Sequence, residues 1–276
     1  MKYELNNDTR RYFGILPLKE NWNRIDISEL ITVVFDDDKI VKILNYSHGY
    51  VEIDTNRDTI DRKVLAPKTT RGKNQKLTLS TILKIRGSGV TFTASFVGGG
   101  ITAFDNKRNV FFIRSYSENN EIRTWEDIDR WVEQFIKESP SDYFTWLHKQ
   151  LNSKRANIQT RPGDVIAFNV GRFEYAFARV LPADFLNLNF GGRPLLILPY
   201  SYTSGTLNIN LDELINKPAL KPIQINDACV YYGESPIVGF KELTESELSK
   251  IGLLTESKYL GIPFTKADII QMNNRW

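Results

Sequence analysis

Residues 161–181 read RPGDVIAFNVGRFEYAFARVL, and this stretch decides the fold of the second half of the chain. A proline–glycine–aspartate turn leads into the apolar run 165–168, and a second run at 173–181 carries aromatic residues at alternate positions. Because successive side chains of a strand point to opposite faces, the aromatic residues share one face and Ala176 and Ala178 share the other. Two strands are therefore expected, and the small side chains predict a strongly bent or barrel-like sheet.

Short strands and short helices are expected after these two strands. Residues 210–218 have the pattern of one short helix ended by proline, and 244–247 form a capping box at the start of another. Strand-like apolar runs occur at 195–198, 206–209 and 229–232. The second half is therefore predicted to be an α+β domain.

The first half belongs to the same class but orders its elements differently. Residues 31–35 and 39–44 are two strand-like runs joined by three aspartates, which indicates a hairpin turn rather than a metal site. A capped amphipathic helix at 124–139 is followed by an aromatic-rich helix that begins at Ser141. Further strands are expected at 90–97, 101–104 and 110–116. The pattern predicts an α+β domain, with a mainly antiparallel sheet and helices at its C-terminal end.

A domain boundary is expected near residue 155. Residues 151–157 are polar and lack an apolar pattern, as linkers between domains do. The net charge of the chain is +3, and the basic excess lies before this boundary. We therefore predict two domains, 1–155 and 156–276.

Composition excludes several classes of protein. Hydrophobic residues make up 41% and charged residues 25% of the 276 positions, as in ordinary folded proteins. No apolar run has the length of a membrane span and the first residues lack the apolar core of a secretion signal, so a cytoplasmic location is expected. The single cysteine, Cys229, excludes an internal disulfide and a multi-cysteine zinc site. We expect neither a metal nor a cofactor.

Basic residues gather between Arg57 and Arg86. Nine lysines and arginines stand there against two aspartates. Such a run usually forms a solvated surface, and it is also suited to contact phosphates or an acidic partner. The residues selected as candidate contacts are Arg62, Lys63, Lys68, Arg71, Lys73 and Lys76.

The sequence lacks the residues that most known catalytic motifs require. The sequence has only two histidines, and it contains no Gly-x-Ser-x-Gly elbow and no His-Glu-x-x-His motif. Catalytic carboxylate pairs are assembled by the fold and have no fixed spacing in the sequence. The alternative of an enzyme whose fold places Asp54, Asp58 and Asp61 near His48 therefore remains. No catalytic residue is predicted.

One part of the chain resembles a known family. The Gly-Asp turn, the apolar strand and the aromatic strand ending in Arg-Val-Leu resemble the opening of the immunity protein 26 family. The similarity covers about residues 156–276 and leaves the role of 1–155 open. The residues that carry the motif, taken as scaffold, are Gly163, Asp164, Val165, Tyr175, Phe177, Arg179, Val180 and Leu181.

This resemblance implies a role in bacterial polymorphic toxin systems. Immunity proteins of these systems bind a cognate toxin, usually encoded nearby, and neutralise it without catalysis. The first hypothesis is therefore a non-enzymatic binding protein with a protein toxin as partner and no membrane contact. Two alternatives stay open: nucleic-acid binding through residues 57–86, and an unrecognised enzyme.

Overall fold

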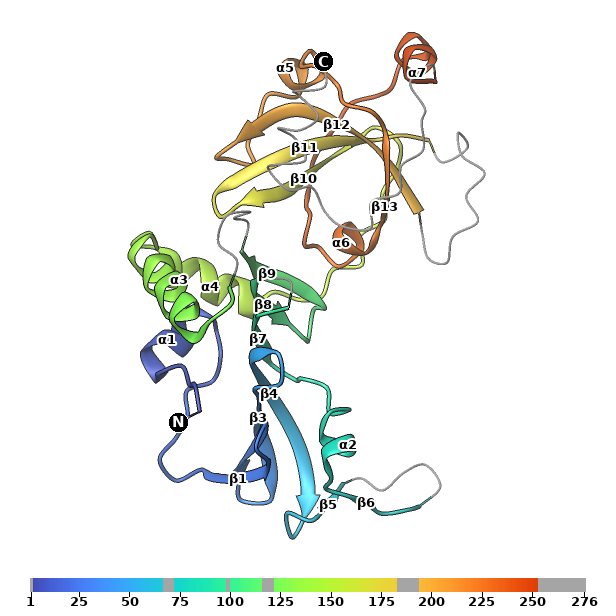
Figure 1. The fold of residues 1–276 in the computed structure, drawn as a ribbon. Helices are drawn as coiled ribbons and strands as arrows, with labels where there is room; N and C mark the ends of the chain where they lie inside the picture. Colours follow the sequence, from blue (N-terminus) through green and yellow to red (C-terminus); the bar gives the residue numbers. More distant parts are fainter. Residues whose placement is uncertain (1, 67–71, 98–99, 116–121, 183–193, 253–276) are drawn as a thin grey trace. The chain divides into compact units, whose positions relative to one another are not determined.

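The protein forms two compact units, one ending at Lys154 and the other starting at Arg155. Each unit is built on an open antiparallel sheet, and the described residues also contain seven helices (Figure 1). The mixed α and β class predicted from the sequence is confirmed. The computed structural model describes residues 2–66, 72–97, 100–115, 122–182 and 194–252.

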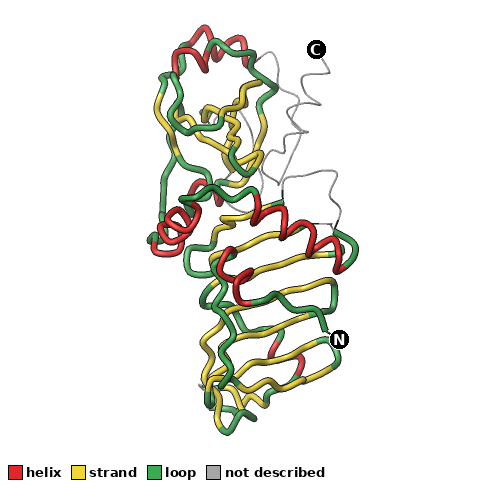
Figure 2. Tube along the Cα trace, turned by 90° about the vertical axis from the view of Figure 1, so that its left-hand side faces the viewer, coloured by secondary structure: helices red, strands yellow, loops and turns green. Residues whose placement is uncertain are grey.

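The sheet of the first unit has nine described strands. They are β1 (Asn23–Ser28), β2 (Ile31–Asp36), β3 (Lys39–Asn45), β4 (Gly49–Ile60), β5 (Val64–Leu65), β6 (Gln75–Lys76), β7 (Val90–Ser95), β8 (Ile101–Asp105) and β9 (Val110–Arg114). Seven of them pair in the order β1-β2-β3-β4-β7-β8-β9, and β5 and β6 extend from the end of β4. In Figure 2 the strands of this unit run side by side across the sheet.

Both faces of this sheet carry a hydrophobic core. Figure 1 shows α1 (Asn7–Tyr12), α3 (Trp125–Lys137) and α4 (Tyr143–Asn152) on one side and α2 (Leu79–Ile82) on the other. Because both faces are covered, β2 and most of β3 are buried at successive positions instead of alternating with solvent. The first core, under α1, α3 and α4, centres on Phe13, Tyr50, Phe92 and Ile128. The second core, under α2, centres on Val33, Phe35, Ile40, Leu65 and Ile82.

The predicted hairpin and capped helix of the first unit are confirmed. β2 and β3 pair across the aspartate turn, and Thr124 caps α3 by a reciprocal exchange of hydrogen bonds with Asp127. The expectation that helices follow the strands holds for α3 and α4 only. Helix α1 precedes the sheet, where the side chain of Asn6 caps its N-terminus. Helix α2 lies between β6 and β7, and the burial of Ile82 in the second core holds it there.

The second unit has a five-stranded sheet in the order β13-β12-β11-β10-β14. Its strands are β10 (Asp164–Gly171), β11 (Glu174–Val180), β12 (Pro194–Ser204), β13 (Ile223–Asn226) and β14 (Ile237–Phe240). Its helices are α5 (Leu211–Ile215), α6 (Ala228–Tyr231) and α7 (Glu245–Gly252). The predicted alternation in β11 is confirmed, because Ala176 and Ala178 enter one core while Phe177 enters the core on the opposite face.

Three expectations for the second unit need correction. The sheet is not a closed barrel, since β13 and β14 stay at its edges while cores pack on both of its faces. Residues 229–232 lie in and directly after helix α6, not in a strand, because Tyr231 donates its backbone N–H to the carbonyl of Asp227. Residues 206–209 lie beyond β12, which ends where the N–H of Thr206 bonds the Ser204 hydroxyl.

The turn before β10 depends on Gly163. Its φ angle is +95°, and a Cβ atom there would lie 2.7 Å from Cε2 of Phe240 and 2.9 Å from the carbonyl oxygen of Lys241. Its N–H donates to the carbonyl of Val180 at 2.9 Å, and its own carbonyl accepts from the N–H of Lys241 at 2.9 Å. One residue thus joins the start of β10 to the end of β11 and to the segment after β14.

We expect Gly163→Ala to lower the free energy of unfolding of the second unit by about 1–3 kcal/mol, because the side chain adds left-handed strain and a clash. Denaturant unfolding of the full chain measures this loss. Gly205→Ala is the matched control, since a Cβ there meets only the carbonyl oxygen of Phe173 at 3.6 Å. Equal stability of the two variants would contradict the role given to Gly163.

Candidate functional site

The described members of the predicted basic set lie in the segment that contains β5 and β6. Lys63, Lys73 and Lys76 are exposed, whereas Lys68 and Arg71 lie outside the described residues.

Arg62 is partly buried, unlike these exposed lysines. Its Nε donates to the carbonyl oxygen of Asp37 at 2.7 Å and lies 3.9 Å from the carboxylate of Asp38. Its guanidinium also lies 5.7 Å from the ring centre of Phe35. Arg62 therefore fastens the start of β5 to the aspartate turn between β2 and β3.

The structure does not assemble the carboxylates around His48. His48 is exposed in the turn before β4, and Asp54 is buried further along that strand, about 20 Å away at the rise of an extended chain. Asp58 pairs with Lys39 at 3.6 Å on the surface, and Asp61 lies in the turn after β4. These groups are spread along one strand, so they do not form the proposed catalytic arrangement.

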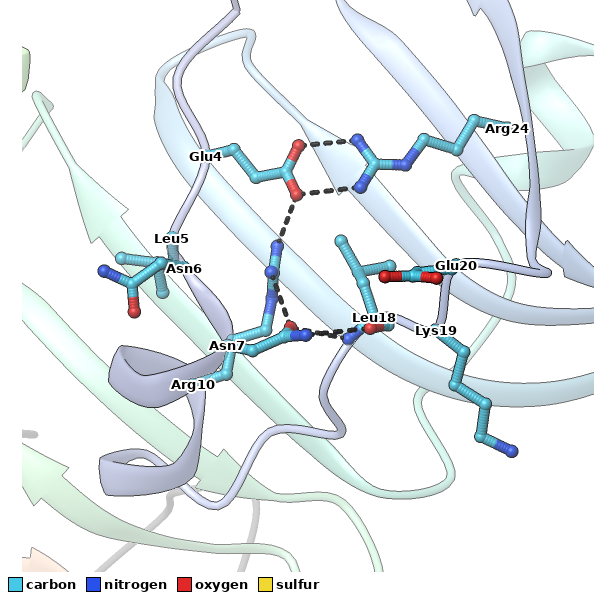
Figure 3. A pocket seen from close by; sticks show the side chains of 9 residues that line it. All are labelled: Glu4, Leu5, Asn6, Asn7, Arg10, Leu18, Lys19, Glu20 and Arg24. Atoms are coloured by element: carbon cyan, nitrogen blue, oxygen red, sulfur yellow. Dashed lines mark hydrogen bonds and ion pairs between the residues drawn. The ribbon is translucent and has the colours of Figure 1, made fainter.

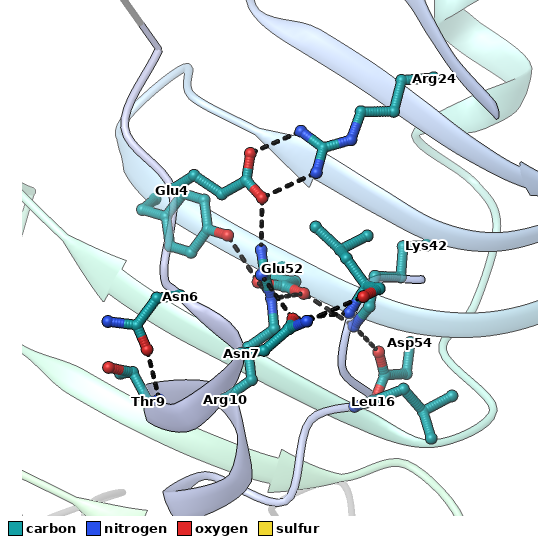
Figure 4. A network of polar contacts seen from close by, with 12 residues as sticks. Glu4, Asn6, Asn7, Thr9, Arg10, Leu16, Arg24, Lys42, Glu52 and Asp54 are labelled. Carbon is teal, nitrogen blue, oxygen red and sulfur yellow. Dashed lines mark hydrogen bonds and ion pairs between the residues drawn. The ribbon is translucent and has the colours of Figure 1, made fainter. Parts of the chain in front are cut away.

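A chain of alternating charges runs into the first unit (Figure 4). Its members, from the surface inward, are Arg24, Glu4, Arg10, Glu52, Lys42 and Asp54. Both terminal nitrogens of Arg24 donate to the carboxylate of Glu4, at 2.7 and 3.0 Å. Arg10 then bridges Glu4 at 3.0 Å and Glu52 at 2.9 Å. Three cations and three carboxylates thus neutralise one another in sequence.

The inner half of this chain is closed to solvent. The side chains of Lys42 and Glu52 are 0% exposed, and Lys42 lies 2.7 Å from Glu52 and also pairs with Asp54. The hydroxyl of Tyr50 donates to Glu52 at 2.5 Å, and the backbone N–H of Leu16 donates to Asp54 at 2.8 Å. Each buried charged side chain in this series of ion pairs therefore has an opposite charge beside it, as burial requires.

The surroundings of each acid set its pKa. Burial raises the pKa of Asp54 to about 6, although Lys42 acts in the opposite direction. Burial alone would also raise the pKa of Glu4, but hydrogen bonds from Arg24 and Arg10 outweigh it and lower that pKa. Glu4 consequently stays charged, while Asp54 titrates close to neutral pH.

The outer end of the charge chain lines a shallow recess of about 270 Å³ (Figure 3). The recess lies between the N-terminal segment, α1 and the loop before β1, and Figure 3 shows the carboxylate of Glu4 turned toward the guanidinium of Arg24. Its lining residues are Glu4, Leu5, Asn6, Asn7, Arg10, Leu18, Lys19, Glu20 and Arg24. Glu4 already accepts bonds from two arginines, so this carboxylate of the recess is paired rather than isolated.

The predictions from the sequence do not include this network of ion pairs. Glu52 and Asp54 alternate with Val51 and Ile53 along β4, a pattern that usually indicates a solvated polar face. The structure instead turns that face toward α1, where Arg10 meets it. The sequence feature that indicates a buried ion pair is Lys42, a cation inside an apolar strand. In the structure Lys42 lies directly opposite Asp54 in the antiparallel register.

In the second unit, the residues of the Gly-Asp motif lie largely inside the fold. Tyr175 is partly buried, and the other seven are buried. The carboxylate of Asp164 accepts from the backbone N–H of Arg161 at 2.8 Å, which closes the turn around Gly163. Val165, Phe177 and Leu181 belong to one core of this sheet and Val180 belongs to the other.

Arg179, also from the motif, links β11 to α7. Its side chain is 2% exposed, and its Nη2 donates to the carboxylate of Glu247 at 2.6 Å. The same carboxylate accepts from the backbone N–H of Thr244 at 2.8 Å and so caps α7. Burial alone would raise the pKa of Glu247, but these bonds outweigh it and lower that pKa. A single carboxylate thereby joins the helix cap to the sheet.

Two exposed phenylalanines of the second unit each lie under an arginine. Phe173, at the turn between β10 and β11, is 51% exposed, with the guanidinium of Arg172 at 5.1 Å from its ring centre. Phe240, at the end of β14, is 43% exposed, with Arg161 at 4.2 Å. Aromatic residues and arginine are enriched among the side chains that dominate binding energy at protein interfaces. These two pairs are therefore the candidate contact positions of this unit.

Cys229 lies in α6 and is partly buried. Burial raises the pKa of its thiol to about 11, which disfavours the nucleophilic thiolate at neutral pH. In the described part of the chain, no group of three or more His, Cys, Asp or Glu side chains is placed to hold a metal ion. No helix in those residues is long and apolar enough to cross a membrane.

The second unit is similar to a known protein family. Residues 161–255 match the family model for Immunity protein 26. The resemblance inferred from the Gly-Asp turn and the aromatic strand is thereby confirmed. The matched segment contains Gly163 and the Arg179–Glu247 pair, and it includes no part of the first unit. No curated protein and no solved structure gives a significant match to the chain.

Lys42→Met tests the charge chain. We expect it to lower the free energy of unfolding of the first unit by about 3–5 kcal/mol, because two buried carboxylates lose their shared cation. Urea denaturation of the full chain measures the change. Lys39→Met on the same strand is the matched control, with an expected change of about 0–1 kcal/mol, since the pair that Lys39 forms with Asp58 is exposed. A Lys42 variant as stable as the control would show that the buried chain contributes little.

The raised pKa of Asp54 predicts a pH dependence of stability. Because the pKa of the folded state is about 6 and the ordinary value is 3.8, the folded protein holds this proton more tightly than the unfolded chain. The stabilising contribution is therefore greatest below the ordinary pKa and is lost as the pH rises through 6.

Unfolding measured at several pH values across this window, for the wild type and for Asp54→Asn, isolates the effect. We expect the stability of the wild type relative to the variant to fall as the pH rises. A difference that stays constant with pH would refute the assignment to Asp54.

Proposed function

We propose that this protein is a toxin-immunity protein that binds a cognate bacterial toxin domain and blocks it by contact, without catalysis. The observation that carries the proposal is the match of residues 161–255 to the Immunity protein 26 family model. Inhibition by contact needs a rigid surface that complements the toxin, and it needs no reactive groups.

The architecture of the second unit supports this mode of action. Its sheet is packed on both faces, and the motif residues are mostly buried, which supports a role for them as scaffold. Phe173 and Phe240 lie at a turn and at a strand end, where their rings stay exposed. We assign the toxin contact to the pairs Phe173 with Arg172 and Phe240 with Arg161.

We further propose that the toxin is encoded beside this gene and meets the immunity protein in the cytoplasm. The support for this part is the family alone. An inhibitor of this kind must reach its toxin before the toxin damages the producing cell, so the two proteins have to share a compartment.

Coexpression tests the proposal. Bacteria that produce a toxin domain encoded next to this gene should survive when the full chain is present, and the two proteins should copurify in a stoichiometric complex. We expect Phe173→Ala and Phe240→Ala to weaken binding by about tenfold or more, as removal of an interface anchor does.

Phe144→Ala is the matched control because Phe144 is an exposed aromatic residue of the first unit, at 42% exposure. Circular dichroism establishes that the variants stay folded. Failure of the wild-type chain to bind or protect against every neighbouring toxin candidate would refute the proposed function. Binding that resists both phenylalanine variants would refute only the assigned contact.

A further inference from the structure

The layer formed by β5, β6 and α2 has an inner and an outer side. Leu65 and Ile82 are buried in the second core of the first unit, and Leu77 and Ile85 pack against it. These four residues hold the layer on the sheet. Side chains of the same layer that are exposed therefore lie on its outer side.

Two leucines remain exposed in this layer: Leu79 at the start of α2 and Leu83 directly after its end. Leu79 is 44% and Leu83 is 58% exposed, and their spacing of one helical turn places them next to each other. Single exposed leucines are common on protein surfaces and need no explanation. An adjacent pair with a charged rim is different, because such patches mark sites of interaction.

Basic residues lie on the segments next to the two leucines. Lys63, Lys76, Lys84 and Arg86 are exposed, and hydrogen bonds to backbone carbonyls hold the segments of Lys63 and Lys76 beside α2. The N–H of Leu77 donates to the carbonyl of Lys63 at 2.7 Å, and the hydroxyl of Thr81 donates to the carbonyl of Lys76 at 2.8 Å. We call this set the α2 surface: Lys63, Lys76, Leu79, Leu83, Lys84 and Arg86.

We propose that the α2 surface is a docking site for an acidic peptide segment with apolar side chains, supplied by a protein partner. Seven basic residues stand against two acidic ones in the described residues from Arg57 to Arg86, so the complementary partner is negatively charged. The partner also needs apolar side chains between its acidic residues. Burial of Leu79 and Leu83 against such side chains is the main favourable contribution to the binding free energy at this contact.

A peptide fits these observations better than a nucleic acid does. The sequence from Arg57 to Arg86 contains no aromatic residue, so the segment lacks a platform on which bases could stack. Phosphates would leave the leucines without an apolar partner.

A membrane fits less well for a different reason. Arg62 binds the turn that carries Asp37 and Asp38 directly beside this layer. An extended anionic lipid surface would face these aspartates together with the lysines, whereas a short acidic segment is able to contact the lysines alone.

Fluorescence anisotropy with defined probes tests the proposal on the full chain. The probes are a labelled peptide of alternating Glu and Leu, a peptide of equal charge with Ser in place of Leu, a single-stranded oligonucleotide, and vesicles that contain phosphatidylserine. We expect the Glu/Leu peptide to bind at least about tenfold more tightly than each other probe, and its affinity to fall as salt is added.

Two double variants divide the contact into its parts. Lys76→Gln with Lys84→Gln should weaken binding of the Glu/Leu peptide and flatten its salt dependence. Leu79→Ser with Leu83→Ser should weaken binding at every salt concentration and abolish the preference over the Glu/Ser peptide. The matched controls are Lys137→Gln on α3 and Leu30→Ser, which is 49% exposed near β1, and both should bind as the wild type does.

Several results would overturn the proposal. Equal binding of the oligonucleotide or the Glu/Ser peptide would identify a general polyanion surface, and tighter binding of vesicles would identify a membrane contact. Absence of peptide binding, or equal effects of the control variants, would remove the site altogether. Because these probes do not involve a toxin, the outcome is independent of the proposed immunity function.

Discussion

The first unit depends on the buried carboxylate of Glu52. It accepts hydrogen bonds from Arg10 of α1 and Tyr50 of β4, and it pairs with Lys42 of β3. Removal of any one charged partner leaves another charge buried without compensation, which costs far more than a surface ion pair contributes. This constraint fastens α1 and the N-terminal segment to the sheet, and it thereby shapes the recess at Glu4.

The second unit contains a partly buried ion pair, between buried Arg179 and the partly exposed Glu247. Arg179 is buried and reaches the cap of α7 through Glu247, while Gly163 brings three segments together through backbone bonds. The family motif therefore acts inside the fold. A scaffold of this kind leaves its turns and strand ends free to carry different contact residues, which suits a protein whose partner must be recognised by surface complementarity.

The two units present different kinds of surface. In the second unit, exposed aromatic rings lie under arginines, an arrangement suited to close contact with a folded partner. In the first unit, Leu79 and Leu83 are exposed near basic residues, an arrangement suited to attraction at a distance together with a small apolar contact. Electrostatic attraction mainly accelerates association, whereas buried anchors mainly slow dissociation, so the two proposed contacts act on different steps of binding.

The local elements of this protein follow from residues that are neighbours in the sequence. Alternation in 173–181, the capping box at Thr124 and the aspartate turn after β2 each depend on such neighbours, and each was predictable. The burial of one face of β4 depends instead on long-range contacts, because Glu52 and Asp54 become compatible with a core when Arg10 and Lys42 pair with them from other segments. The openness of the second sheet and the exposure of Leu79 and Leu83 were decided in the same way, since both depend on what packs against each face.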